Sequence, residues 1–285
     1  MEIKIAEKMF AELAENDCYK AKDLFNQNYR KIRQTVVDYQ YLRYIYNKHE
    51  YPFVKDEYFI GLFRRFYAMR FVQPHFVTSF FTKMEEIRNG NNNVDYDAVD
   101  VTWEVCGQDT KQFSFITKML NLYDDTRYPI YDNMVGRVCL LFYNIYDTED
   151  LRKKQFEYWY KRIKEVYITL FDKEHIEDST KIIHIFRDVF RCPAKEDLTD
   201  QRIVDIILWQ LGESLGKLWP LERISEENPK NIKLLKEEGI TVEKLIKRGV
   251  SRTDIIDSGR FTKEDVFETA LKYGREQKEK ANQNK

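Results

Sequence analysis

The chain has 285 residues, of which 43% are apolar and 33% charged, and its formal net charge is −1. This balance argues against nucleic-acid binding through bulk charge, so any such binding would need a local basic patch. Few glycines (10) and prolines (6) accompany 19 tyrosines and 19 phenylalanines, which argues against a hairpin-rich β fold or a disordered chain and favours helices.

The cysteines Cys18, Cys106, Cys139 and Cys192 form no CxxC pair and lie in or beside apolar runs. We expect buried, reduced thiols, as in a cytoplasmic protein. The N-terminal segment is charged and lacks the apolar core of a signal peptide, and no apolar run approaches the roughly 20 residues of a membrane span. The sequence therefore predicts cytoplasmic localisation and no membrane partner.

Apolar residues recur at helical spacing along most of the chain. The expected helices cover residues 2–15, 18–47, 55–70, about 74–84, 94–106, 149–171, 176–190 and 199–218. An asparagine-rich segment, Asn89–Asn93, predicts a loop. No segment alternates polar and apolar residues with period two. The sequence thus predicts an all-α fold, a multi-helix orthogonal bundle, with its main domain over residues 1–220.

Residues 221–285 are expected to form a small helical appendage. Three similar segments, Gly239–Thr241, Gly249–Ser251 and Gly259–Thr262, each place a glycine and an apolar residue before a Ser or Thr cap. Each cap predicts a helix of about two turns, and residues 275–285 are expected to fray. The appendage either docks a protein partner or packs on the main domain. A helix-turn-helix is a third interpretation, although no recognition helix stands out.

The sequence contains no motif of the common cofactor or metal sites. The four histidines are scattered, and the cysteines lack the spacing of metal ligands, so we expect no metal site. P-loop, GxGxxG and GxSxG motifs are missing from the sequence, which removes support for the usual NTPase, dinucleotide and hydrolase mechanisms. We expect no cofactor.

Cations mix with aromatic residues in three segments, Tyr29–Arg33, Phe63–Tyr67 and Tyr158–Arg162. Such mixtures suit contacts with phosphates and stacked bases. Solvated helix faces explain them equally well, because acidic residues are interleaved. Nucleic-acid binding is therefore one of two interpretations of these segments.

Most of the residues that could carry chemistry lie within Thr110–Val138. The pattern predicts a helix, a short polar loop closed by Pro129, and a second helix opened by Asp132. As an N-cap, Asp132 would be ionised and held by backbone amides. The same geometry would present its carboxylate at the mouth of a cleft, so a structural and a catalytic role both stay open.

Two lysines could face Asp132. Lys111 would lie in the first turn of the preceding helix, where the helix dipole disfavours the protonated amine. Lys118 would lie two turns further along, between Phe115 and Met119, where partial burial would lower its pKa. A neutral amine can attack a carbon centre and form a Schiff base.

The segments Gly107–Lys111 and Asp132–Val138 resemble the helix-hairpin-helix DNA glycosylases, in which a hairpin leads into a lysine-bearing helix and an Asp opens the next helix. Phe113–Lys118 (FSFITK) and the PIYD ending resemble a more divergent branch with an oxoguanine-glycosylase-like fold. The resemblance implies two all-α lobes around a base-flipping pocket, with duplex DNA as the partner. It also implies N-glycosidic cleavage supported by Asp132, with Lys118 or Lys111 as the amine.

The nucleic-acid contacts that we expect on this hypothesis are Arg64, Arg65, Thr117, Tyr131, Arg137 and Trp159. The alternative hypothesis is a catalytically inactive interaction module that docks a protein partner through residues 221–285, because a fold of this kind says little about chemistry.

Overall fold

The computed structural model describes residues 4–50, 52–69, 72–90, 94–107, 112–140, 149–192, 198–216 and 240–283. Over these residues the secondary structure is helical without a strand, which confirms the predicted all-α class. In this described part of the chain, no helix has both the length and the apolar character that crossing a membrane requires.

The chain forms two compact units. Unit 1 comprises Met1–Ile32 and Tyr67–Leu218, and unit 2 comprises Arg33–Phe66 and Trp219–Lys285. The predicted boundary near residue 220 falls within residues 217–239, outside the described residues. The C-terminal helices thus cluster with a segment that the sequence analysis assigned to the main domain.

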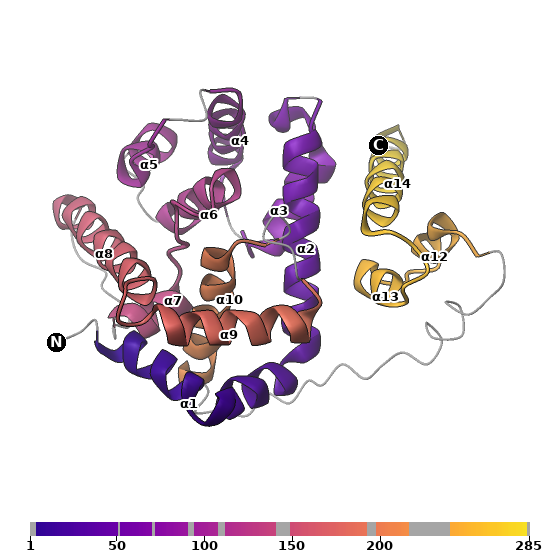
Figure 1. Ribbon diagram of the computed structural model, residues 1–285. Coiled ribbons are helices and arrows are strands. Elements are labelled where there is room, and N and C mark those ends of the chain that lie inside the picture. The colour runs from indigo at the N-terminus through magenta and orange to yellow at the C-terminus, as the bar shows by residue number, and fades with distance from the viewer. Residues whose placement is uncertain are drawn as a thin grey trace. The chain divides into compact units, whose positions relative to one another are not determined.

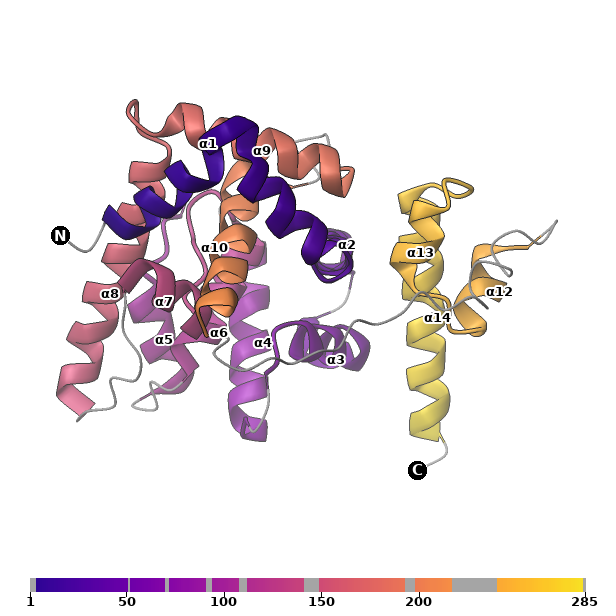
Figure 2. The same cartoon turned by 90° about the horizontal axis from the view of Figure 1, so that it is seen from below.

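Unit 1 is built around one buried helix. Its helices are α1 (Lys4–Gln27), α4 (Pro74–Asn89), α5 (Ala98–Cys106), α6 (Phe113–Tyr123), α7 (Asn133–Leu140), α8 (Glu149–Leu170), α9 (Ile176–Phe190) and α10 (Asp200–Gly216). In both views α10 lies in the middle of the unit (Figure 1, Figure 2), with α7 and α9 packed on it. Most described side chains of α10 are buried, which fits the apolar residues of its central part, residues 203–211, and the burial also includes the polar residues Arg202, Asp205 and Gln210.

The crossing of α10 and α7 depends on Gly212. A Cβ atom at this position would lie 2.0 Å from the carbonyl oxygen of Met134 in α7. Real Cβ atoms do not approach backbone so closely, so only glycine permits this crossing. The crossing fixes the start of α7 against the central helix.

The predicted break after Asn16–Asp17 is present as a kink within α1. Asn16, Asp17 and Cys18 have positive φ values of 50°, 54° and 59°. Asn and Asp tolerate this left-handed conformation better than most residues, which explains the position of the kink. The prediction of one helix over residues 18–47 is wrong, because α1 ends at Gln27 and a second helix begins at Tyr29.

Unit 2 combines the remaining helices. These are the part of α2 (Tyr29–Lys48) from residue 33 onward, the short η1 (Phe53–Lys55), α3 (Glu57–Phe66), α12 (Val242–Lys247), α13 (Arg252–Asp257) and α14 (Lys263–Gln283). Arg33 of α2 donates to Asp257, the last residue of α13, with Nε 3.0 Å from Oδ1. The ring centroids of Tyr41 and Phe267 are 5.0 Å apart. The C-terminal helices were expected either to dock a protein partner or to pack on their own chain. The structure shows that they contact residues of α2 in their own chain.

One prediction for the C-terminal helices is wrong. The third helix is not a two-turn helix, because α14 has 21 residues and continues to Gln283, through most of the segment that was expected to fray. Its length is stabilised by contacts with α3 and the loop before it. Arg275 Nη2 lies 2.9 Å from Asp56 Oδ2, and Asn282 donates to Glu57 over 3.2 Å. The helices α12 and α13 are short, as predicted.

The predicted helix over residues 55–70 is wrong at both ends, since α3 spans only Glu57–Phe66. Asp56 accepts a hydrogen bond from the Phe59 amide at 2.9 Å and so caps this helix. In the same way, Asp97 accepts from the amides of Val99 and Asp100 and starts α5 later than residue 94.

Candidate functional site

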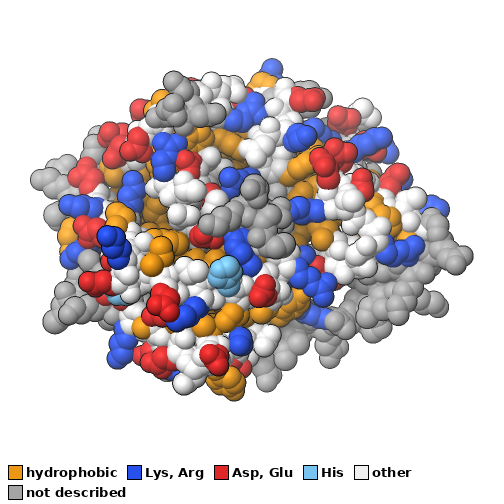
Figure 3. Space-filling view, viewed as in Figure 1, with side chains coloured by type: hydrophobic (Ala, Val, Ile, Leu, Met, Phe, Trp, Pro, Cys, Tyr) orange, Lys and Arg blue, Asp and Glu red, His pale blue; other side chains and the backbone are white. Residues whose placement is uncertain are grey.

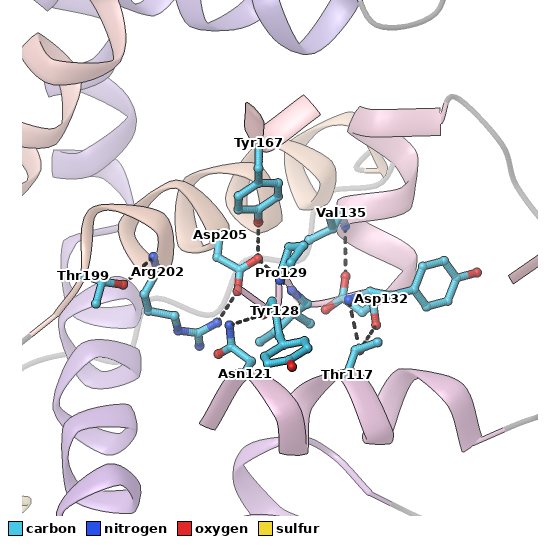
Figure 4. Close-up of polar contacts among 12 residues, drawn as sticks. Thr117, Asn121, Tyr128, Pro129, Asp132, Val135, Tyr167, Thr199, Arg202 and Asp205 are labelled. Carbon is cyan, nitrogen blue, oxygen red and sulfur yellow. Dashed lines mark hydrogen bonds and ion pairs between the residues drawn. The ribbon is translucent and has the colours of Figure 1, made fainter. Parts of the chain in front are cut away.

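The predicted helix, loop and capping aspartate are all present between α6 and α7. The loop after α6 runs through Pro129 to Asp132, where α7 begins. Asp132 Oδ1 accepts hydrogen bonds from the amides of Met134 and Val135, each at 2.9 Å (Figure 4). Its carboxylate therefore caps the positive end of the α7 helix dipole.

Two buried side chains of α6 fix this loop. Thr117 Oγ1 lies 3.1 Å from the amide nitrogen of Tyr131 and accepts its hydrogen bond. One turn along α6, Asn121 Nδ2 donates to the carbonyl oxygen of Tyr128 at 2.8 Å (Figure 4). Because loop carbonyls and amides are satisfied by a helix face, the backbone that leads to Asp132 is held in one position.

The buried carboxylate of Asp205 in α10 holds the loop from the other side. It accepts hydrogen bonds from the Tyr167 hydroxyl of α8, from Arg202 Nη1 at 2.6 Å and from the Ile130 amide at 3.3 Å (Figure 4). The side chain of Asp205 is 1% exposed. Sequence reasoning missed this residue; the available signal was a lone carboxylate inside the apolar run Ile203–Leu208.

Lys118 lies in the same region, on α6 one residue after Thr117. It is half-buried, and its Nζ is 5.3 Å from the ring centroid of Phe115 and 5.7 Å from that of Tyr67. Burial lowers the pKa of the Lys118 amine, and the negative charge of Asp132 opposes this shift. The charges of Lys118 and Asp132 therefore act on each other electrostatically.

Asp205 also belongs to this group of charges. Burial raises the pKa of Asp205 to about 6, although Arg202 and the Tyr167 hydrogen bond favour its ionised form. The negative charge of Asp132 adds to the increase. Two cations, Lys118 and Arg202, and two carboxylates, Asp132 and Asp205, thus share one region of unit 1.

An aromatic cluster lies beside the capping aspartate. The rings of Tyr131 and Trp159 are nearly parallel, at 2°, with centroids 6.5 Å apart. Phe113 stacks on Phe156 at 4.7 Å and meets Tyr131 edge-on at 5.4 Å. Trp159 is 8% exposed and Phe113 is buried, whereas Tyr131 and Phe156 are half-buried, so these two rings are partly accessible.

Comparison with known proteins leaves the family open. No family model, curated protein or solved structure matches the chain.

The structure brings together Lys118, Asp132, Thr117, Tyr131 and Trp159 of the expected site. It does so through the Thr117–Tyr131 hydrogen bonds, the Tyr131–Trp159 stacking and the charge interaction of Lys118 with Asp132. These contacts all lie within unit 1.

The other expected residues are placed differently. Lys111 lies outside the described residues, as does the side chain of Arg137, whose backbone belongs to α7. Arg64 is half-buried and Arg65 exposed in the last turn of α3, which belongs to unit 2.

The described surface mixes charges of both signs. On the face in Figure 3, Lys and Arg side chains alternate with Asp and Glu side chains. Arg162 of α8 follows this pattern, since its Nη1 lies 3.0 Å from Glu165 Oε2. Among the described residues, no group of three or more His, Cys, Asp or Glu could hold a metal ion.

Proposed function

We propose that unit 1 recognises a base rotated out of duplex DNA and cleaves its N-glycosidic bond. Asp132 would stabilise the positive charge that develops on the sugar, and Lys118 would supply the amine. The observation that supports this proposal is the pairing of Lys118 with Asp132. A lysine with a lowered pKa lies within the electrostatic influence of an aspartate fixed at a helix N-terminus.

The chemistry follows from the two groups. Cleavage breaks the bond between C1′ and the base, whose nitrogen keeps the electron pair and takes up a proton. The neutral Lys118 amine forms a new bond to C1′, and opening of the sugar ring then gives an imine. The carboxylate of Asp132 favours the cationic sugar in the transition state by its negative charge. Without attack by the amine, water would give the same free base.

The aromatic cluster supports the proposal in a second way. A base outside the helix is held by stacking and by hydrogen bonds to its edge. Tyr131 is half-buried and adjacent in sequence to Asp132, so it is placed to stack on a bound base.

Borohydride trapping tests the amine. Reduction of the imine would link Lys118 covalently to a duplex that carries an oxidised, alkylated, deaminated or methylated base. We expect a trapped complex with the wild-type chain that is lost in Lys118→Ala. Lys164→Ala is the matched control, because Lys164 also lies over an aromatic ring, with Nζ 5.1 Å from the Tyr160 centroid.

Free-base release must be measured on the same duplexes, because an enzyme that uses water does not trap. Lys118→Ala and Lys164→Ala with equal trapping would contradict the role of Lys118. Failure of trapping, base release and duplex binding at low salt together would contradict the proposed function.

The alternative function, an interaction module acting through residues 221–285, has less support. The described contacts of α13 and α14 lie on α2, on α3 and on the loop before α3. We therefore place base excision first.

A further inference from the structure

We propose that Asp205 is a positioning residue of this site and regulates it by its charge. It lies on α10 and holds the loop that contains Asp132. Its ionisation state changes the electrostatic interaction between Asp132 and Lys118. The inference rests on the proposed function in treating Lys118 and Asp132 as the reacting pair.

The first support is the geometry of the loop. Asp205 Oδ1 accepts from the Ile130 amide at 3.3 Å, two residues before Asp132. The next carbonyl back along the chain is held as well, because the Tyr160 hydroxyl donates to the Pro129 oxygen at 3.2 Å. Asp205 is the carboxylate that bonds directly to the loop backbone, so it can transmit a change in its own protonation to the loop.

The second support is the free-energy cost of burying the ion pair of Asp205 with Arg202. Asp205 and Arg202 are 1% and 5% exposed, and burial of an ion pair is seldom more stable than apolar packing of the same volume. Asp205 also accepts from the Tyr167 hydroxyl, which fixes the carboxylate against α8. A buried pair of this kind, hydrogen-bonded to the backbone of a candidate catalytic loop, is explained by a role in that loop.

The third support is the charge balance. The positive charge of Arg202 lowers the pKa of Lys118, whereas the negative charge of Asp205 raises it. With Asp205 neutral, the Lys118 amine therefore loses its proton more easily. The titratable and charged groups that face Asp205 are Arg202, Tyr167, Asp132, Lys118, Cys139, Tyr67 and Tyr160.

The effect of Asp205 on the protonation of Lys118 can be measured on the full chain without DNA. Reductive methylation with 13C-formaldehyde labels the lysines, and the dimethyl signal of Lys118 is assigned by its loss in Lys118→Arg. We expect this signal to titrate at lower pH in Asp205→Asn than in wild type. Asp200→Asn is the matched control, because Asp200 also lies on α10 and pairs with an arginine, Arg187 Nη2, at 2.7 Å.

A second comparison avoids leaving the Arg202 guanidinium without its carboxylate. Arg202→Gln and the double variant Arg202→Gln/Asp205→Asn differ only at Asp205. We expect the Lys118 signal to titrate at lower pH in the double variant. Coincident titrations in either folded pair, wild type with Asp205→Asn or Arg202→Gln with the double variant, would overturn the electrostatic part of the proposal.

Amide hydrogen exchange tests the positioning part. We expect the Ile130 amide to exchange faster by roughly fivefold or more in Asp205→Ala, as for the loss of one hydrogen bond, and not in Asp200→Ala. Equal exchange of Ile130 in both variants would overturn this part. Because neither measurement uses DNA, failure here is distinguishable from the failure of trapping and base release that would contradict the proposed function.

Discussion

At the scale of single residues, Asp132 has two roles that substitution can separate. Its carboxylate caps α7 through the Met134 and Val135 amides, and its charge acts on Lys118. Asparagine also caps helices well but has no charge. The pair of substitutions by Asn and by Ala therefore distinguishes the cap from the charge.

We expect Asp132→Ala to lower the free energy of unfolding by about 1 kcal/mol and Asp132→Asn by only a few tenths, measured in urea. Base release should fall by at least about a hundredfold in both variants, because both remove the charge. An Asp132→Asn variant that retains full base release would show that the carboxylate serves only as a cap.

A second residue, Asp56, links the stability of unit 2 to pH. Burial alone would raise its pKa, but hydrogen bonds from His49, from the Phe59 amide and from Arg275 outweigh burial and lower the pKa of Asp56 to about 2. A lowered pKa means that the ionised form stabilises the fold above the ordinary value of 3.8. This stability is lost as the pH falls from there toward 2.

We expect Asp56→Asn to lower the free energy of unfolding by roughly 2 kcal/mol at pH 7, with the difference shrinking as the pH approaches 2. Urea unfolding at a series of pH values, followed with a probe in unit 2, measures this. A difference that stays constant between pH 7 and pH 2.5 would contradict the proposed ionic role of Asp56.

At the scale of elements, Gly212 in unit 1 and Gly274 in unit 2 permit close packing of helices. Gly212 brings α10 against the backbone of α7, whereas Gly136, in α7 itself, has open space where a Cβ would be. We expect Gly212→Ala to destabilise unit 1 by roughly 1–3 kcal/mol through overpacking. Gly136→Ala should stabilise it by up to about 1 kcal/mol through helix propensity. Thermal unfolding of both variants tests this, and equal effects would contradict the described crossing.

Gly274 has the corresponding position in unit 2. A Cβ there would lie 2.0 Å from a ring carbon of Tyr58, and this ring is held by the Tyr41 hydroxyl at 3.0 Å. We expect Gly274→Ala to destabilise the docking of α14 by roughly 1–3 kcal/mol. Amide exchange along α14 would report the change. Gly61→Ala, with open space around its added Cβ, is the control and should leave that exchange unchanged.

Local elements were the most predictable part of the fold. Periodicity and caps located α8, α9 and α10 to within two residues and the start of α4 at Pro74, and Thr199 does accept a hydrogen bond from the Arg202 amide at 3.1 Å. The length of α14 was not predictable, because it depends on contacts with Asp56 and Tyr58, more than 200 positions earlier in the sequence. Composition at the C-terminus alone indicated fraying.

At the scale of the whole molecule, the sequence does not reveal which distant segments pair. Arg33 and Asp257 form an ion pair across 224 positions, and neither residue differs in sequence from an ordinary surface residue. For the same reason, the grouping of residues 33–66 with the C-terminal helices was not predicted. Helical periodicity identifies buried faces but not their partners.

The candidate site shows the same limit. Asp132 and Lys118 were predicted from local signals, a cap position and an apolar neighbourhood, and both lie in unit 1, where the charge of Asp132 acts on Lys118. Asp205 was not predicted, because its role depends on how α10 packs beside the loop at Ile130. That packing is a property of the folded unit.

The most direct test of the account is single-turnover release of free base from modified duplex DNA by the wild-type chain, Lys118→Ala and Asp132→Asn. We expect release by the wild type and a loss of at least about a hundredfold in Asp132→Asn, as for other groups that stabilise transition-state charge. Lys118→Ala should lose the trapped imine and retain at most slow release through water. Equal release by all three proteins would contradict the assignment of Lys118 and Asp132 as the reacting pair.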